Sequence, residues 1–173
     1  MGTQSHTAQK RHVAFLSLGS NVGDTRHHLE SAREELMTLG VATEEASPLY
    51  ATEPVDFKAQ PWFLNQVIRV HTILTPMELL EVCSRVEDMH LRQREIPKGP
   101  RTLDIDILLY DDLIVEHPQL QIPHPQIPLR RFVLEPLATL VPEEMHPVLH
   151  DTFRNLLAKC QDRAQVQRLE ETD

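Results

Sequence analysis

The sequence predicts an α+β fold, a sandwich of helices packed on a mostly antiparallel sheet. Two segments with apolar residues at helical spacing alternate with four segments that have the apolar pattern of strands. The resulting order, strand-helix-strand-strand-helix-strand, is typical of ferredoxin-like domains. The 173 residues suit one compact domain. We therefore expect a flexible leader over residues 1–12 and a single domain over residues 13–173.

The first predicted strand and helix occupy the segment before residue 40. Residues 12–18 form a nearly continuous apolar run, as expected of a strand covered on both faces. A turn follows, and Asp24 is placed to cap a helix that Gly40 ends. The apolar side of this helix consists of Leu29, Ala32, Leu36 and Leu39. Residues 41–50 are predicted to form the second strand.

The second half of the predicted pattern begins with a loop. Residues 51–61 contain two prolines and read as a mobile loop, and residues 62–74 read as a long strand. Residues 75–78 form a capping box with proline at the first helical position, so a helix begins there. Its buried stripe is expected to contain Leu79, Cys83 and Val86. A second loop, residues 91–101, leads to the last strand, residues 102–110.

The last predicted strand alternates between apolar and polar residues. One face is expected to carry Leu103, Ile105, Ile107 and Leu109, and the other Thr102, Asp104, Asp106, Leu108 and Tyr110. A short apolar run at residues 113–115 follows. A proline-rich segment, residues 118–128, is expected to wrap the surface before one or two C-terminal helices.

Composition excludes several classes of protein. The net charge of −9 argues against nucleic-acid binding, which needs a positive field. No apolar run approaches the roughly 20 residues that span a bilayer, and the N-terminal residues lack the apolar stretch of a signal peptide. We expect no membrane partner and a cytoplasmic location.

The two cysteines, Cys83 and Cys160, have no metal-binding spacing and are expected to be reduced thiols.

Two aspartates on the last predicted strand suggest a metal site. Asp104 and Asp106 are two residues apart, so their carboxylates lie on the same face. Magnesium takes one or two carboxylates together with phosphate oxygens of a substrate. A solvated polar face of an edge strand would also explain this pattern. The preceding Gly99-Pro100-Arg101 favours the metal site, because Arg101 lies close enough to meet phosphates that the metal brings.

Arginines gather in the loop before this strand. Arg92, Arg94 and Arg101 stand out against the acidic composition. A guanidinium grips phosphate oxygens in pairs, so these residues are candidates for stabilising a phosphoryl transfer. A loop that carries them could close over a nucleotide. We expect Arg85, on the preceding helix, to be a solvated surface charge.

An aromatic ring and a carboxamide share one face of the long strand. Phe63 and Asn65 suit a flat heteroaromatic ligand, although a core aromatic beside a hydrogen-bonded asparagine explains them equally well. Phe132 and Trp62 are further candidates for stacking. His124, held between two prolines, is either a rigid hydrogen-bond donor to a phosphate or an ordinary surface histidine. A P-loop kinase is excluded, because no GxxxxGK[ST] motif occurs.

Several of these motifs together resemble one enzyme family. The sequence resembles the 6-hydroxymethyl-7,8-dihydropterin pyrophosphokinases from Val13 to about Gln161, and the segment GPRTLDIDIL is the most specific match. The other matching segments are Leu18–Asn21, Leu49–Pro54, Phe63–Asn65, the helix with Glu87, Ile122–Pro125 and Arg131–Leu137. The resemblance implies transfer of diphosphate from ATP to the hydroxymethyl group of 6-hydroxymethyl-7,8-dihydropterin, releasing AMP, in folate biosynthesis. It also implies a ferredoxin-like fold and a monomer.

The resemblance assigns roles to individual residues. Asp104 and Asp106 would bind two magnesium ions and, with Arg92 and Arg101, form the catalytic group. The ATP site would comprise Glu87, Arg92, Arg94, Arg101, Ile107, His124 and Arg130, with Glu87 and Ile107 near the adenine. The pterin site would comprise Thr52, Pro54, Val55, Phe63, Asn65 and Phe132. Asn21 would support the mobile loops.

Three positions depart from patterns found in some members of the family. Lys98 stands where those members have a loop tryptophan, Pro125 where they have a tyrosine, and Phe63 where they have a tyrosine. These departures affect the contacts to ATP and not the class of reaction.

Two other functions fit part of the sequence, a nucleotide-sensing module without catalysis and a metal-dependent nuclease. The first leaves the paired aspartates unexplained, and the acidic charge disfavours the second.

Overall fold

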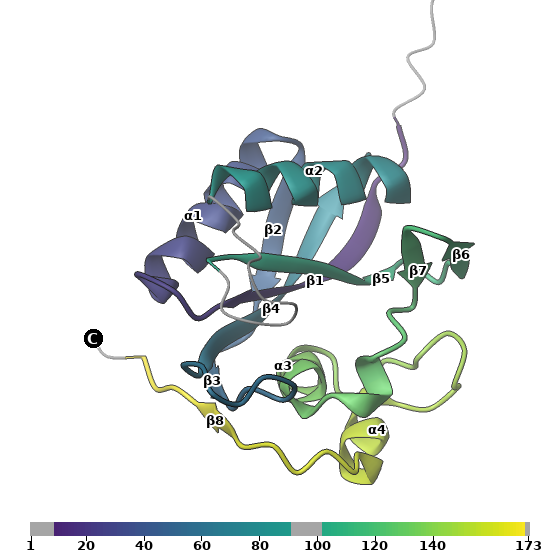
Figure 1. Cartoon of the computed structure of the whole chain (residues 1–173). Helices are drawn as coiled ribbons and strands as arrows, with labels where there is room; N and C mark the ends of the chain where they lie inside the picture. The colour runs from purple at the N-terminus through teal and green to yellow at the C-terminus, as the bar shows by residue number, and fades with distance from the viewer. Residues whose placement is uncertain (1–8, 91–101, 172–173) are drawn as a thin grey trace, which may run out of the picture.

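A computed structural model of the chain describes residues 9–90 and 102–171 (Figure 1). The loop predicted over residues 91–101 lies outside this part, as does most of the predicted leader. The main sheet has the order β5-β1-β4-β3-β8, with β2 also paired to β4, and every pairing is antiparallel. Its strands are β1 (His12–Ser20), β2 (Val41–Ala46), β3 (Tyr50–Thr52), β4 (Phe63–Thr72), β5 (Asp104–Tyr110) and β8 (Val166–Arg168).

Helices lie on both sides of this sheet. Helices α1 (Thr25–Thr38) and α2 (Pro76–Met89) pack side by side over one face (Figure 1). Helices α3 (Arg131–Leu140) and α4 (Phe153–Lys159) lie on the other side, where they pack against each other and α3 contacts β3, β4 and β8. The order β1-α1-β2-β4-α2-β5 within this arrangement is ferredoxin-like, so the predicted fold class is confirmed.

Two hydrophobic clusters hold the layers together. One joins the sheet to α1 and α2 and contains Leu16, Leu36 and Val86, all fully buried. The other joins the opposite face to α3 and α4 through residues such as Leu134 and Phe153. The predicted buried sides of both helices are confirmed, except that Leu39 follows the end of α1 and is only partly buried. No helix in residues 9–90 and 102–171 is long and apolar enough to cross a membrane.

The predicted helix starts are confirmed in detail. Asp24 accepts a hydrogen bond from the backbone N–H of His27 at 3.1 Å, which caps α1. Gly40, just after α1, has a φ of 91°, a conformation that favours glycine. At α2, the Thr75 hydroxyl accepts from the Glu78 N–H, and the Glu78 carboxylate accepts from the Thr75 N–H, each at 3.2 Å.

The clean alternation predicted for the last strand is wrong at its end. The pairing of β1 with β5 shifts between Phe15 and Leu16, which leaves an extra residue in β5. Leu108 and Leu109 consequently both pack in the cluster with α3, and Tyr110 packs in the cluster with α1 and α2. Before the shift the predicted alternation holds, so Asp104 and Asp106 do share a face.

Three further segments differ from the prediction. The strand predicted over residues 41–50 is divided into β2 and β3, because the chain leaves the extended course at Ser47. There the Ser47 N–H donates to the Val67 carbonyl, and the Ser47 hydroxyl accepts from the Val67 N–H. Residues 113–128 do more than wrap the surface. They form the hairpin of β6 (Val115–His117) and β7 (Leu120–Ile122) and the short helix η1 (Ile127–Leu129). Strand β8 was not predicted, because three residues carry no usable pattern.

Replacing Thr75 by alanine removes the capping hydroxyl of α2. We expect the free energy of unfolding to fall by about 1 kcal/mol, because the Glu78 N–H loses its partner. Chemical denaturation measures this change. Ser84→Ala, at an exposed position of the same helix, is the control and should leave the value nearly unchanged. An equal loss in both variants would show that the cap contributes nothing.

Candidate functional site

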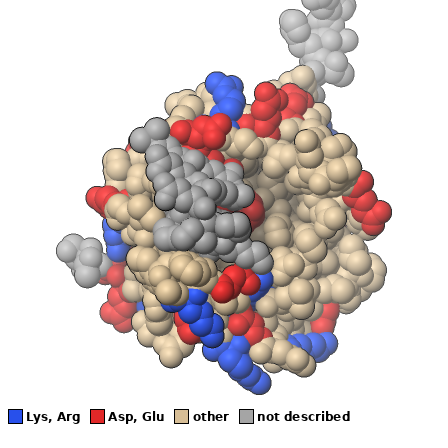
Figure 2. All heavy atoms as spheres, in the orientation of Figure 1, with Lys and Arg blue, Asp and Glu red and all other residues tan. Residues whose placement is uncertain are grey.

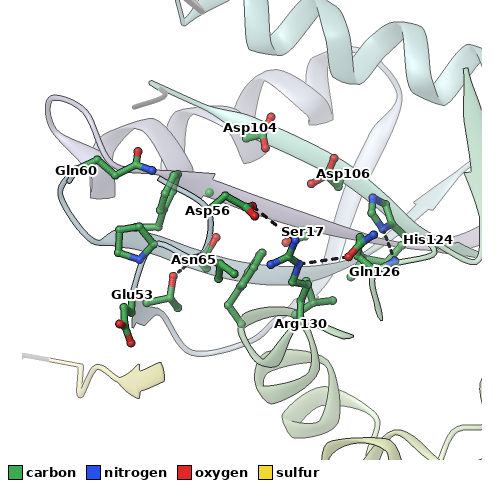
Figure 3. A pocket seen from close by; sticks show the side chains of 18 residues that line it. Ser17, Glu53, Asp56, Gln60, Asn65, Asp104, Asp106, His124, Gln126 and Arg130 are labelled. Atoms are coloured by element: carbon green, nitrogen blue, oxygen red, sulfur yellow. Dashed lines mark hydrogen bonds and ion pairs between the residues drawn. The ribbon is translucent and has the colours of Figure 1, made fainter. Parts of the chain in front are cut away.

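A pocket of about 370 Å³ opens on the sheet face that α3 and α4 cover only in part. It brings together most of the residues that the sequence predicts for the site (Figure 3). These residues are Thr52, Pro54, Val55, Phe63, Asn65, Asp104, Asp106, His124, Arg130 and Phe132.

Strand register builds the floor of this pocket. Gly19 of β1 lies opposite Asn65 of β4 on one side and opposite Asp104 of β5 on the other. Ser17, two residues earlier, lies opposite Asp106. Because directly opposed residues of antiparallel strands point to the same face, the carboxamide and both carboxylates face the pocket.

Gly19 makes room for Asn65. A Cβ atom on Gly19 would lie 2.6 Å from Asn65 Oδ1, closer than packed atoms come. The Asn65 side chain is buried, and its Nδ2 donates a hydrogen bond to the hydroxyl of Thr52 on β3. Glycine at this position therefore allows the carboxamide to lie across β1 at a fixed place in the pocket.

The segment between β3 and β4 forms one wall. Pro54 and Val55 belong to it, and Asn21, in the turn after β1, binds it from behind. Asn21 Nδ2 donates to Gln60 Oε1 at 2.9 Å and to the Pro61 carbonyl at 3.0 Å. Asn21 thus connects the start of α1 to the wall, a position consistent with the predicted support of a loop.

Two half-buried aromatic residues also line the pocket. Phe63 begins β4, and Phe132 lies in the first turn of α3, so the two rings come from different layers of the fold. Trp62, the other candidate for stacking, is 41% exposed and is not among the described residues that line the pocket.

His124 lies at the end of the pocket next to β5. Its backbone N–H donates to the Leu108 carbonyl at 2.9 Å, which ties the segment to the bulged part of β5. Nδ1 accepts from the Gln126 N–H at 3.1 Å, so in the neutral ring the proton is on Nε2. Burial lowers the pKa of His124, and the negative charge of Asp104 opposes this shift in part.

The two neighbouring arginines at the start of α3 differ in their surroundings. Arg130 lines the pocket, where its guanidinium lies 3.5 Å from Asp56 Oδ2 and its Nε donates to Gln126 Oε1 at 3.3 Å (Figure 3). Arg131 instead pairs with Glu135 at 3.1 Å and donates to the Asp162 carbonyl at 3.0 Å. Arg130 is placed to meet a ligand, whereas Arg131 anchors α3 to the C-terminal segment.

The two aspartates fit a hard divalent cation. Asp104 is half-buried and Asp106 is exposed, and both carboxylates face the pocket. Within residues 9–90 and 102–171, no three His, Cys, Asp or Glu side chains are grouped as a complete metal site. Magnesium does not need one, because it commonly binds one or two carboxylates and takes its other ligands from water and substrate phosphates.

Two predicted ATP contacts lie apart from the pocket. Glu87 is buried on α2, where its Oε2 accepts from the Ile105 N–H at 3.2 Å, and Ile107 is buried in the cluster beneath that helix. Both residues lie on the opposite face from the aspartates. Arg92, Arg94 and Arg101, and Lys98 with them, lie outside the described residues.

Several pocket residues were not predicted. Strand register explains Ser17 and Gly19, because the pairing of β1 with β5 sets Ser17 opposite Asp106 and Gly19 opposite Asp104. Asp56, Gln60 and Gln126 also line the pocket, but they lie in loops where no periodicity marks them. Leu108, Val133 and Glu53 complete this set.

Charge on the visible face is divided into small groups. In the space-filling view, Asp and Glu side chains occur at several separate places, and Lys and Arg gather mainly towards the lower edge (Figure 2). This distribution agrees with the net charge of −9. A local cationic group such as Arg130 is therefore set in a mostly acidic protein.

The fold and the pocket together define a class of protein. The chain is a ferredoxin-like α+β domain with a pocket on its partly covered sheet face, and this pocket is lined by aromatic, carboxamide, carboxylate and guanidinium side chains. Comparison with known proteins is more specific. A family model described as 7,8-dihydro-6-hydroxymethylpterin-pyrophosphokinase (HPPK) matches residues 15–142. The chain belongs to this family and is a pyrophosphokinase of folate biosynthesis.

Individual relatives agree with this membership. The 2-amino-4-hydroxy-6-hydroxymethyldihydropteridine pyrophosphokinase of Methylorubrum extorquens is 40% identical over 158 residues, which cover 91% of this chain and 98% of the relative. The Bacillus subtilis protein of the same name is 41% identical over 129 residues, covering 74% of this chain and 77% of the relative. Folic acid synthesis protein fol1 of Schizosaccharomyces pombe is 40% identical over 155 residues, but the match spans only 21% of its length.

Solved structures share the fold. A crystal structure of wild-type Plasmodium falciparum HPPK-DHPS with pterin and p-hydroxybenzoate matches with a TM-score of 0.71 at 19% sequence identity. The match covers 88% of this chain and 44% of that one. At this identity the likeness concerns the fold alone, and it agrees with the ferredoxin-like arrangement described above.

The charge of Asp104 should be measurable at His124. We expect the pKa of His124 to be lower than that of a free histidine side chain, because burial disfavours the imidazolium. Asp104→Asn should lower this pKa further, since it removes the negative charge that favours the imidazolium. NMR titration of the imidazole signals measures both values. An unchanged or raised pKa in the variant would contradict the proximity of the two side chains.

Proposed function

We propose that this chain transfers the diphosphate group of ATP to the hydroxymethyl group of 6-hydroxymethyl-7,8-dihydropterin in a magnesium-dependent reaction that releases AMP. The observation that carries this proposal is the row formed by Asn65, Gly19 and Asp104 across three adjacent strands. It sets a fixed carboxamide, suited to a pterin, beside carboxylates suited to a metal–phosphate complex.

The acceptor would occupy the end of the pocket near β3 and β4. Asn65 offers a carbonyl and an amino group to the edge of the pterin, and burial makes an unmatched polar edge costly. Phe63 and Phe132 supply flat apolar surfaces on which the heterocycle can stack. Pro54, Val55 and Thr52 complete this end of the pocket.

The phosphates would occupy the end near β5 and α3. His124 presents a ring whose Nδ1 already accepts from the backbone, so Nε2 is its donor. Arg130 adds a guanidinium from the start of α3. We propose that Arg92, Arg94 and Arg101 join them, with Arg92 and Arg101 stabilising the charge that develops during transfer.

Asp104 and Asp106 would hold the magnesium, two ions as the resemblance implies. When bound, magnesium orients the phosphate chain and neutralises part of its charge. The contribution of the chain itself is to keep two carboxylates on one strand face, so that both meet the same region of the pocket. Carboxylate oxygens are the ligands that magnesium prefers, so this arrangement suits a site for cations.

The transfer itself requires alignment more than covalent help from the protein. The hydroxyl oxygen of the pterin bonds to the β-phosphorus of ATP as the bond from that phosphorus to the bridging oxygen of the α-phosphate breaks. The hydroxyl proton passes to solvent, and AMP leaves. Fixing the pterin on Asn65 and the phosphates near Asp106 places the reacting atoms in one pocket, the main source of acceleration here.

Glu87 and Ile107 remain proposed neighbours of the adenine. Strand β5 pairs only with β1 among the described strands, so its other edge is not covered by a strand. The Ile105 N–H points to this edge, where it meets Glu87, and alternate residues of a strand direct their N–H groups to the same side. The backbone of Ile107 therefore faces the edge along which an adenine could bind.

We propose further that the chain acts as a monomer in the cytoplasm, with residues 13–173 forming one pyrophosphokinase domain. The composition and the resemblance support these proposals. Size-exclusion chromatography with light scattering tests the first directly, and a mass of two chains would contradict it.

Asp106→Ala removes an exposed carboxylate of the pocket. We expect AMP release from ATP and hydroxymethyldihydropterin to fall at least about a hundredfold, because the metal–phosphate complex loses a ligand, while the melting temperature changes little. Asp112→Ala, an exposed position just after β5, is the control and should retain activity. Substantial turnover by Asp106→Ala would refute the metal assignment.

A further inference from the structure

Asp56 faces the one cationic side chain among the described residues that line the pocket. From this arrangement, and on the basis of the proposed function, we propose that Asp56 is an internal counter-ion that competes with the nucleotide phosphates for Arg130. Asp56 would thereby set the affinity of the enzyme for ATP. It would be a specificity-determining residue on the wall of the pocket and would take no part in the chemistry.

Among the described residues that line the pocket, Arg130 has more than one carboxylate near it. The described lining residues include four carboxylates, Glu53, Asp56, Asp104 and Asp106, but only one guanidinium, that of Arg130. Asp104 and Asp106 are the proposed metal ligands. Glu53 has a partner of its own, because its Oε2 accepts from the Gln165 N–H at 2.8 Å. Asp56 is the pocket carboxylate that forms an ion pair with Arg130.

The contact joins two separate parts of the fold. Asp56 lies in the segment between β3 and β4, and Arg130 lies at the start of α3, so the pair crosses the pocket (Figure 3). Gln126 holds the guanidinium from the other side through Nε. Arg130 is therefore positioned before any ligand arrives, with a carboxylate where a phosphate oxygen would bind.

The pair has the properties of an exchangeable contact. The separation of 3.5 Å is longer than a good charge-assisted hydrogen bond, and the side chains of Asp56 and Arg130 are 41% and 21% exposed. Ion pairs this exposed contribute little to stability. A phosphate chain carries more charge and offers paired oxygens that match a guanidinium, so it can take over Arg130. Release of Asp56 then subtracts from the affinity for the nucleotide.

Asp56→Asn tests the competition, because it keeps the size of the side chain and removes its charge. We expect the Kd of a non-hydrolysable ATP analogue with magnesium, measured by isothermal titration calorimetry, to fall about two- to fivefold. The KM for ATP should fall in parallel. Asp56→Glu, which retains a carboxylate, should stay near the wild-type value. A Kd for Asp56→Asn that is unchanged or higher would overturn the proposal.

Two comparisons separate competition for Arg130 from a general effect of negative charge. Glu53→Gln removes a carboxylate from the same wall, but that carboxylate accepts from the Gln165 N–H. The effect of Glu53→Gln on the Kd should therefore be less than half that of Asp56→Asn. In an Arg130→Gln background, Asp56→Asn should no longer tighten binding, because the contested guanidinium is absent. Equal tightening with and without Arg130, or an equal effect of Glu53→Gln, would overturn the proposal.

The same measurements distinguish this proposal from the function on which it rests. If the wild-type chain releases no AMP from ATP and the pterin, the proposed function fails. If it does release AMP and the Kd for the nucleotide does not respond to Asp56→Asn, the proposed function stands and the role of Asp56 is refuted.

Discussion

The antiparallel pairing of β1 with both β4 and β5 is the constraint on which the rest of the structure depends. It sets Gly19 between Asn65 and Asp104, so one strand position connects the proposed acceptor end of the pocket to the proposed metal end. A shift of one residue in either pairing would turn one of these side chains towards α1 and α2. The buried cluster beneath those helices opposes such a shift, because it would expose apolar residues.

Packing beneath α1 and α2 therefore protects the site from the opposite face of the sheet. Helices α1 and α2 cover one face of the sheet, and α3 and α4 cover only part of the other. The bulge in β5 moves Leu109 to the α3 side and Tyr110 to the α2 side, and His124 bonds the Leu108 carbonyl at this point. A local irregularity in the strand thus places an imidazole near Asp104 at the end of the pocket.

The described charges of the pocket have a consequence for affinity. Carboxylates outnumber the guanidinium among its described lining residues, so an anionic ligand gains most when it arrives with cations and when Arg130 is available to it. Asp56 offers a way to adjust that availability without changing a residue that meets the reacting atoms. An affinity set in this way can be altered in a loop while the sheet stays the same.

The sequence by itself determined the features that local rules control. The caps at Asp24 and Thr75 and the shared face of Asp104 and Asp106 follow from short-range geometry, and all were predicted correctly. The GPRTLDIDIL segment indicates the family from the sequence alone. Only the tertiary structure decided the bulge in β5, the added strand β8 and the meeting of Asp56 with Arg130. These features depend on contacts between segments far apart in the chain, and no local pattern records which distant residue will lie opposite.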